Sequence, residues 1–311
     1  MTVLSWADVQ SQLGQGPSLL LGNGFGRSLT ESFSYGKLYP QVEKNLPDAA
    51  KQIFAGLGTA DFEQVLRAVD HAEVVNKAHG LSSDGFETTR ARIRAGLIEA
   101  VLAVHPEKRS AVDAKWQERA RDLLHQFERI FTTNYDLLLY WLLISSSTDY
   151  CDGFGMQTGD LRFEKNYPYA HRYFYLHGAL HLFTAQDDVR KVKAKRKSLR
   201  ETLAETMAAH NYPLFISEGT HASKRRRIEA SPYLRYALEQ LCASRGTLVT
   251  LGLGFWENDL HIAGALCDAP ELDRVFVGVH GGSPADVDRL SKVFGATRMA
   301  DVRFFDTKGV L

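Results

Sequence analysis

The last quarter of the sequence alternates strands and helices so regularly that few folds can accommodate it. Residues 247–251, 275–279 and 302–305 are short apolar runs, typical of buried strands. Residues 258–267 and 283–293 lie between them with helical spacing, and the second of these segments has a proline at its first turn. Strands that are apolar throughout and joined by helices predict a parallel sheet with both faces covered.

Three further strands extend this sheet toward the N-terminus. Residues 18–21, 128–133 and 173–176 are the other buried runs, and each leads into a polar or glycine-rich segment. Two long segments interrupt them: a helical insertion at about residues 40–127 and a basic insertion at about residues 185–231. We expect a Rossmann-like, doubly wound α/β fold that forms one domain over all 311 residues.

Charge and composition exclude several classes of protein. Lysine plus arginine and aspartate plus glutamate both number 37, so the whole chain has no excess charge for a polyanionic partner. The sequence has no apolar run near the roughly 18 residues of a membrane span and no basic segment of a secretory signal. Cys151, Cys242 and Cys267 are far apart and form no disulfide or metal pattern. We expect a cytoplasmic protein that does not bind membranes.

The first strand leads into a segment rich in glycine. Its residues are Gly22, Asn23, Gly24, Phe25, Gly26, Arg27 and Ser28. Glycines let a backbone approach a phosphate closely, and the N-terminus of a following helix favours its negative charge. The pattern is one residue short of the dinucleotide fingerprint, and no acidic residue ends a strand about 20 residues later, which counts against an oxidoreductase. A tight turn without a ligand is the alternative.

Polar side chains follow the second strand without interruption. They are Thr132, Thr133, Asn134, Tyr135 and Asp136. Polar groups at the end of a buried strand are best satisfied by a ligand or by water. The alternative is an N-cap by Asn134 or Asp136 for a helix at residues 137–144, which accounts for only one of these side chains.

The third strand leads into His177 and Gly178. Histidine can serve as a base near neutral pH, and a structural histidine is the alternative. His181 lies four residues on and would share a helix face with His177, as metal ligands do, but no third ligand has useful spacing.

The fourth strand leads into a second glycine segment. Gly252 and Gly254 permit close approach of a ligand, while Asn258 or Asp259 can cap the helix that follows. Each of the four segments is ambiguous alone, but all four follow strands of the same expected sheet.

Together the four segments resemble the NAD-site motifs of sirtuin-like domains, in the same order. They are residues 22–28, 133–136, 177–178 and 252–259, and the resemblance extends from about residue 18 to 305. Its most specific element is Thr133-Asn134-Tyr135-Asp136 combined with His177-Gly178. The sequence is most similar to a bacterial branch of this superfamily, whose relatives include NAD-consuming effectors of antiphage defence.

This resemblance implies an NAD glycohydrolase, which cleaves the nicotinamide–ribose bond to give nicotinamide and ADP-ribose. Asn134 would hold the nicotinamide ribose or the attacking water, Asp136 would orient groups near the nicotinamide, and His177 would be the base on a ribose hydroxyl. NAD would be the substrate, and no metal is expected.

The resemblance also implies which residues bind NAD. The first glycine segment would hold the diphosphate, and Gly252 and Gly254 would lie beside the adenosine half. The full binding set is Gly22, Asn23, Gly24, Phe25, Gly26, Ser28, Thr133, Gly252, Gly254 and Asp259.

The sequence departs from protein deacetylases of this family. They carry a structural zinc on two Cys-x-x-Cys pairs, which this chain lacks, so deacylation is not expected. Asn23 stands where sirtuins usually have a small residue.

Other functions and partners remain open at this point. One alternative is a sensor that binds NAD or ADP-ribose without cleaving it. Another is nucleic-acid binding through basic residues at 190–200 and 224–227, which we expect instead to form a solvated helix face or loop. Because toxic NADases usually need restraint, a homo-oligomer or a regulatory protein partner is the expected means of control.

Overall fold

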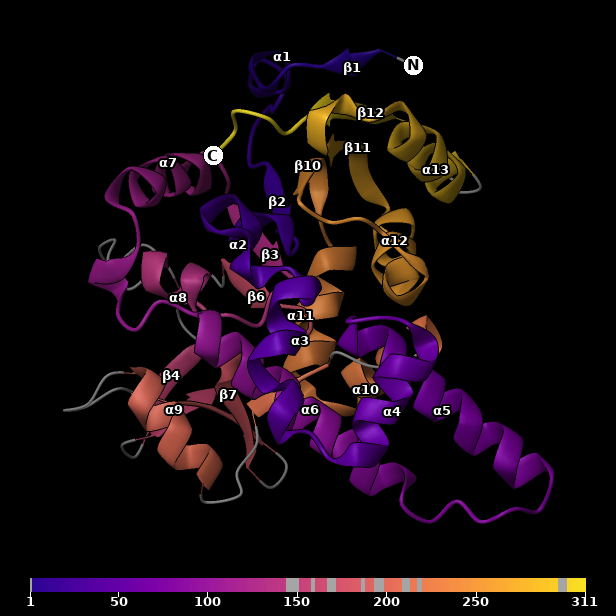
Figure 1. The fold of residues 1–311 in the computed structure, drawn as a ribbon. Coiled ribbons are helices and arrows are strands. Elements are labelled where there is room, and N and C mark those ends of the chain that lie inside the picture. The colour runs from indigo at the N-terminus through magenta and orange to yellow at the C-terminus, as the bar shows by residue number, and fades with distance from the viewer. Residues whose placement is uncertain are drawn as a thin grey trace.

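The main sheet is parallel throughout in the computed structural model. The structure describes residues 2–143, 151–157, 160–166, 172–185, 188–192, 199–208, 213–216, 220–295 and 301–311. Seven described strands pair in one sheet (Figure 1). In sheet order they are β1 (Val3–Leu4), β12 (Val302–Asp306), β11 (Glu271–Val279), β10 (Arg245–Leu251), β2 (Ser18–Leu21), β3 (Arg129–Thr132) and β6 (Tyr173–Tyr175).

The strand order reverses between β2 and β10. From β2 the chain builds outward through β3 to β6, then returns to the other side of β2 and builds outward again through β10, β11 and β12. Such a reversal is the topological switch point of a doubly wound fold, where the loops at the carboxyl ends of the strands diverge and leave a crevice.

Helices cover the sheet on both sides, as the apolar strands require. Figure 1 shows α7 on one side of the strands and α12 and α13 on the other. The helices nearest the sheet are α1 (Trp6–Gln10), α2 (Gly24–Leu29), α7 (Ala114–His125), α8 (Leu138–Leu143), α11 (Pro232–Cys242), α12 (Leu260–Cys267) and α13 (Pro284–Gly295). The expected doubly wound α/β fold is confirmed.

A helical insertion follows β2 and α2, as the sequence indicates. Its longer helices are α3 (Tyr35–Val42), α4 (Asp48–Leu57), α5 (Phe62–Ala78) and α6 (Phe86–Val104). The short 3-10 turns η1 (Glu31–Phe33), η2 (Glu43–Asn45) and η3 (Arg109–Ala111) connect them and lead into α7. Asp61 caps α5, because its carboxylate accepts hydrogen bonds from the backbone N–H groups of Glu63 and Gln64.

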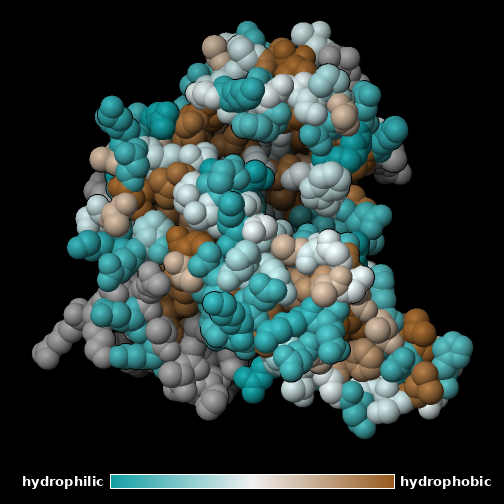
Figure 2. Space-filling view, viewed as in Figure 1, coloured by the Kyte–Doolittle hydropathy of each residue, from teal (hydrophilic) through white to brown (hydrophobic). Residues whose placement is uncertain are grey.

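The far end of the α5–α6 hairpin exposes apolar side chains. Val74, Val75 and Leu81 are more than half exposed, and Figure 2 shows brown surface at this end of the molecule. The rest of α5 buries Phe62, Val65 and other apolar residues against the core, so only the tip presents apolar groups to solvent. Within the described ranges, no helix combines the length and the apolar character needed to cross a bilayer.

A second sheet, which no pattern in the sequence indicates, lies beside β6. It is antiparallel, with the order β4 (Phe154–Gln157), β5 (Asp160–Phe163), β8 (Asp188–Lys191), β7 (Gly178–Ala185) and β9 (Pro213–Phe215). Among its described residues, the basic insertion expected at 185–231 contributes β8 and β9 to a sheet that begins at Phe154. It also contains α9 (Leu199–Ala208) and α10 (His221–Ala230).

Candidate functional site

The strand register brings the four predicted segments to one edge of the sheet. Leu21 of β2 is paired with Thr132 of β3 on one side and with Leu251 of β10 on the other. Thr132 is in turn paired with Tyr175 of β6. Since these residues are the last of their strands, the four segments begin at the same level.

A single cavity of about 980 Å³ connects all four segments at the switch point. The predicted site residues that line it are Asn23, Gly24, Ser28, Thr133, Asn134, Asp136, His177, Gly252, Gly254 and Asp259. Gly22, Phe25 and Gly26 belong to the first segment but do not line the cavity; Phe25 is buried and packs on the ring of Trp116. Tyr35, Asp61 and Glu63 of the helical insertion complete one wall.

The glycines are needed where two loops cross. The N–H groups of Gly22 and Gly24 donate hydrogen bonds to the carbonyls of Leu251 and Gly252. A Cβ on Gly24 would lie 2.5 Å from the Cα of Gly252, and a Cβ on Gly252 would meet the Cα of Gly24 at the same distance. The contact between the two backbones therefore requires glycine at both positions, whatever ligand the segments bind.

Gly252→Ala is expected to lower the free energy of unfolding by about 2 kcal/mol more than Gly14→Ala. Both glycines have φ +72°, so both substitutions introduce the same backbone strain, but nothing lies within 4 Å of a Cβ at Gly14. Urea unfolding of the two variants measures the difference. Equal losses of stability in the two variants would show that the loops at Gly24 and Gly252 can move apart without lowering the free energy of unfolding.

Asn134 is held in place by two hydrogen bonds, one from its backbone and one from its side chain. Its backbone N–H donates to Thr132 Oγ1 at 3.0 Å, and its Nδ2 donates to the carbonyl of Gly22 at 2.9 Å. The second bond joins the segment after β3 to the loop after β2. The amide oxygen, an acceptor, is left for a ligand in the cavity that Asn134 lines.

Asp136 both caps a helix and lines the cavity. Its Oδ1 accepts a hydrogen bond from the N–H of Leu138 at 2.7 Å, so the N-cap expected for α8 is provided by Asp136. Burial raises the pKa of this carboxyl to about 6. At neutral pH it is predominantly an anion on the wall of the cavity.

Asp136→Asn is expected to reduce the pH dependence of stability between about pH 4 and pH 6. The pKa of Asp136 in the folded state, about 6, exceeds its ordinary value of 3.8, so the folded protein binds this proton more tightly than the unfolded chain. Its contribution to stability, at most about 3 kcal/mol, is present at low pH and is lost as the pH rises toward 6. Asparagine keeps an oxygen for the Leu138 N–H but does not ionise. Urea unfolding at a series of pH values measures the free energy of unfolding. The same dependence of this free energy on pH in Asp136→Asn and in wild type would contradict the prediction.

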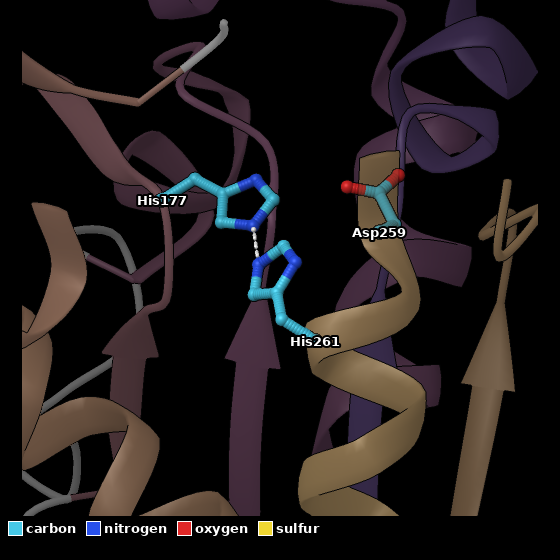
Figure 3. Close-up of side chains that lie close together, drawn as sticks. All are labelled: His177, Asp259 and His261. Carbon is cyan, nitrogen blue, oxygen red and sulfur yellow. Dashed lines mark hydrogen bonds between the residues drawn. The ribbon is translucent and has the colours of Figure 1, made fainter. Parts of the chain in front are cut away.

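His177 meets a second histidine, His261, behind the cavity wall. The two Nε2 atoms are 2.9 Å apart, and the side chains are only 3% and 4% exposed (Figure 3). Burial, with the positive charge of Lys224, lowers the pKa of His177 well below its usual range and that of His261 to about 3. Both rings are therefore neutral at pH 7. His177 lines the cavity, whereas His261 projects from α12 behind it.

His177 and His181 do not share a helix face, the arrangement that a metal site built on them would need. His181 lies in strand β7, and its ring stacks on Tyr140 with 4.5 Å between the ring centroids. Gly178, which follows His177, has a φ of +78°. A Cβ at this position would overlap the carbonyl oxygen of Leu214, so the position requires glycine.

A buried cation lies next to this histidine pair. Lys224 of α10 is completely buried, and its Nζ is 2.8 Å from Glu63 Oε2 and 3.2 Å from Asp259 Oδ1. Asn258 also donates a hydrogen bond to Glu63. Burial alone would lower the pKa of Lys224, but the two carboxylates outweigh it and raise that pKa. Asp259 makes no cap bond to α12, so its role here is to pair with Lys224.

The basic residues of the sequence therefore do not form one solvated surface. Lys224 is buried, although its neighbour Arg225 is exposed and pairs with Glu229 at 2.9 Å. In the other basic segment, Lys191 of β8 pairs with Asp152 at 2.6 Å. Residues 193–198 of that segment lie outside the described residues.

His177, Asp259 and His261 are also of the types that bind zinc. One ligand atom from each lies within 4.8 Å of the others (Figure 3). Asp259 is also ion-paired with Lys224, which Glu63 shares, and the positive charge of this ammonium opposes a further cation beside it.

Two features of the cavity escaped the sequence analysis. At one end of it, the guanidinium of Arg289 lies 3.8 Å from the ring centre of Trp256 and donates to the carbonyl of Gly254 at 2.8 Å. On the wall formed by the helical insertion, Tyr35 donates to Glu63 at 2.7 Å. His261 lies two residues after Asp259, and this closeness is a local signal that could have placed His261 at the site. No such signal in the sequence links Glu63 or Lys224 to the site.

Comparison with known proteins gives a family but no activity. No curated protein matches the chain. A family model described as a domain of unknown function, DUF4917, matches residues 19–310, a range that includes all four segments of the cavity. The chain therefore belongs to the DUF4917 family.

Proposed function

We propose that the chain is an NAD glycohydrolase that releases nicotinamide and ADP-ribose. The observation that carries this proposal is the convergence of Asn134, Asp136 and His177 on one cavity at the switch point of a doubly wound sheet. Dinucleotides bind at such points, and a volume of about 980 Å³ is sufficient for one. The resemblance of the four segments to the NAD site of sirtuin-like domains supports NAD as the ligand.

The chemistry needs polar groups and a base, but no acid. Nicotinamide leaves as a neutral molecule from a cationic ring, so its departure requires no proton. The bond between the ribose carbon and the pyridinium nitrogen breaks, and water supplies the oxygen of the new bond and releases one proton. The difficult species is an oxocarbenium-like ribose, which fixed dipoles and anions stabilise.

Each polar side chain of the cavity has a place in this reaction. The anchored amide of Asn134 offers an acceptor to a ribose hydroxyl or to the attacking water. The anion of Asp136 favours positive charge on the ring or the developing cation. His177 is neutral at pH 7, and a lone pair on its ring can accept a hydrogen bond from a ribose hydroxyl or from water.

The first experiment is product analysis of NAD incubated with the purified chain, beside calorimetry with NAD. Equal amounts of nicotinamide and ADP-ribose would support the proposal. Tight binding without nicotinamide release would favour a sensor of NAD or ADP-ribose. The resemblance to defence effectors extends the proposal to a toxin-like role in bacteria, which predicts that expression of the active chain lowers cellular NAD.

A further inference from the structure

We infer that His261 is a positioning residue that holds His177 in the tautomer with hydrogen on Nε2 and a free lone pair on Nδ1. This inference rests on the proposed function, since it concerns how His177 acts as the base. His261 belongs to α12, follows the fourth segment by two residues, and has no place in the motifs that identified the site.

The geometry of the pair allows only two arrangements. A separation of 2.9 Å between the Nε2 atoms is a hydrogen bond, so one nitrogen carries a hydrogen and the other a lone pair. A doubly protonated pair would place two N–H groups against each other, and the burial that keeps both rings neutral excludes it. The direction of this single hydrogen bond fixes the tautomer of both rings.

Only one direction leaves His177 able to accept a proton from the cavity. Figure 3 shows the second nitrogen of His177, Nδ1, pointing away from His261. Nε2 is occupied by His261, so a base facing the cavity must use Nδ1. A lone pair on Nδ1 requires the hydrogen on Nε2, and His261 must then accept it.

The surroundings of the pair favour a stable, neutral acceptor. The titratable groups around the pair are Lys224 of α10, whose ammonium is held by Glu63 of α5 and Asp259 of η4 (Glu257–Asp259), and His221 and Arg225, also of α10. The positive charge of Lys224 acts on both imidazoles in the same direction and opposes their protonation. His261 can therefore accept a hydrogen bond from His177 without taking its proton.

Two substitutions of His261 separate positioning from packing. Leucine fills a similar volume but offers no acceptor, whereas glutamine offers an amide oxygen at the end of a side chain of comparable length. We expect His261→Leu to lower kcat for NAD hydrolysis at least about 100-fold with KM within about threefold, because the base loses its fixed tautomer. His261→Gln should recover most of this loss. Equal kcat in wild type and His261→Leu would overturn the inference.

Nitrogen-15 NMR of histidine-labelled wild-type protein observes the tautomer directly, whatever the variants do. The His177 signals are those that disappear in His177→Gln. A protonated Nε2 and an unprotonated Nδ1 are the expected result, and a protonated Nδ1 would overturn the inference even if His261→Leu does not fold. If wild type shows the expected tautomer but cleaves no NAD, the proposed function fails while the positioning by His261 stands.

Discussion

His177→Gln is expected to lower kcat for NAD hydrolysis about 1,000-fold while the Kd for NAD stays within about threefold of wild type. Glutamine keeps a polar side chain of similar length but cannot accept a proton from water or a ribose hydroxyl. His177 lines the cavity beside the second segment, and burial keeps its ring neutral, so that one ring nitrogen has a lone pair. Steady-state kinetics and calorimetry measure the two quantities separately.

His181→Gln is the matched control. It removes a buried histidine four residues away that stacks on Tyr140 and does not line the cavity. Its kcat should remain within about threefold of wild type. If His177→Gln and His181→Gln lose activity equally, the loss comes from disturbed packing of the fold, and His177 is not the base.

Lys224→Met is expected to lower the free energy of unfolding by about 3 kcal/mol or more. Methionine fills much of the same space but leaves the carboxylates of Glu63 and Asp259 without their cation, while Glu63 keeps its hydrogen bonds from Tyr35 and Asn258. The cost comes mainly from these unpaired charges, since both side chains are less than a fifth exposed. Denaturant unfolding at neutral pH measures the loss.

Arg225→Met, one residue along the same helix, is the control for this substitution. Arg225 and Glu229 are both about half exposed, and we expect their pair to contribute less than about 1 kcal/mol. Adding Glu63→Gln to Lys224→Met should restore part of the lost stability by removing one unpaired charge. Similar losses for Lys224→Met and Arg225→Met would contradict a special role for the buried cation.

The main sheet was predictable because its strands are short apolar runs buried on both faces. Residues 18–21 are all buried, and the strand they form ends where the glycine segment begins. A run of this kind can be identified as a strand without knowing which strand it pairs with. Its alternation with helices then predicts that the strands pair in parallel.

The antiparallel sheet gave no comparable signal. Its strands are short, and β8 (Asp188–Lys191) buries only Val189 among charged residues. In isolation such a strand has the composition of a surface loop, and only pairing with β5 and β7 makes it regular.

The four segments that follow the strand ends were also predictable as part of the site, because each comes directly after a strand that the sequence indicates. The contacts behind the cavity were not, because they join residues distant in the sequence. His177 and His261 are 84 residues apart, and Lys224 is 161 residues from Glu63. Their meeting depends on the packing of α5, α10 and α12, which no local pattern specifies.

The most direct test of the proposed activity is chromatographic measurement of nicotinamide released from NAD by wild type and by Asn134→Ala. Asn134 joins the second segment to Gly22 and does not take part in the histidine pair, so the variant tests the cavity independently of the base. We expect wild type to release nicotinamide and ADP-ribose in equal amounts and Asn134→Ala to release neither while remaining folded. Equal release by both proteins, or none by wild type when NAD is bound, would contradict hydrolysis in this cavity.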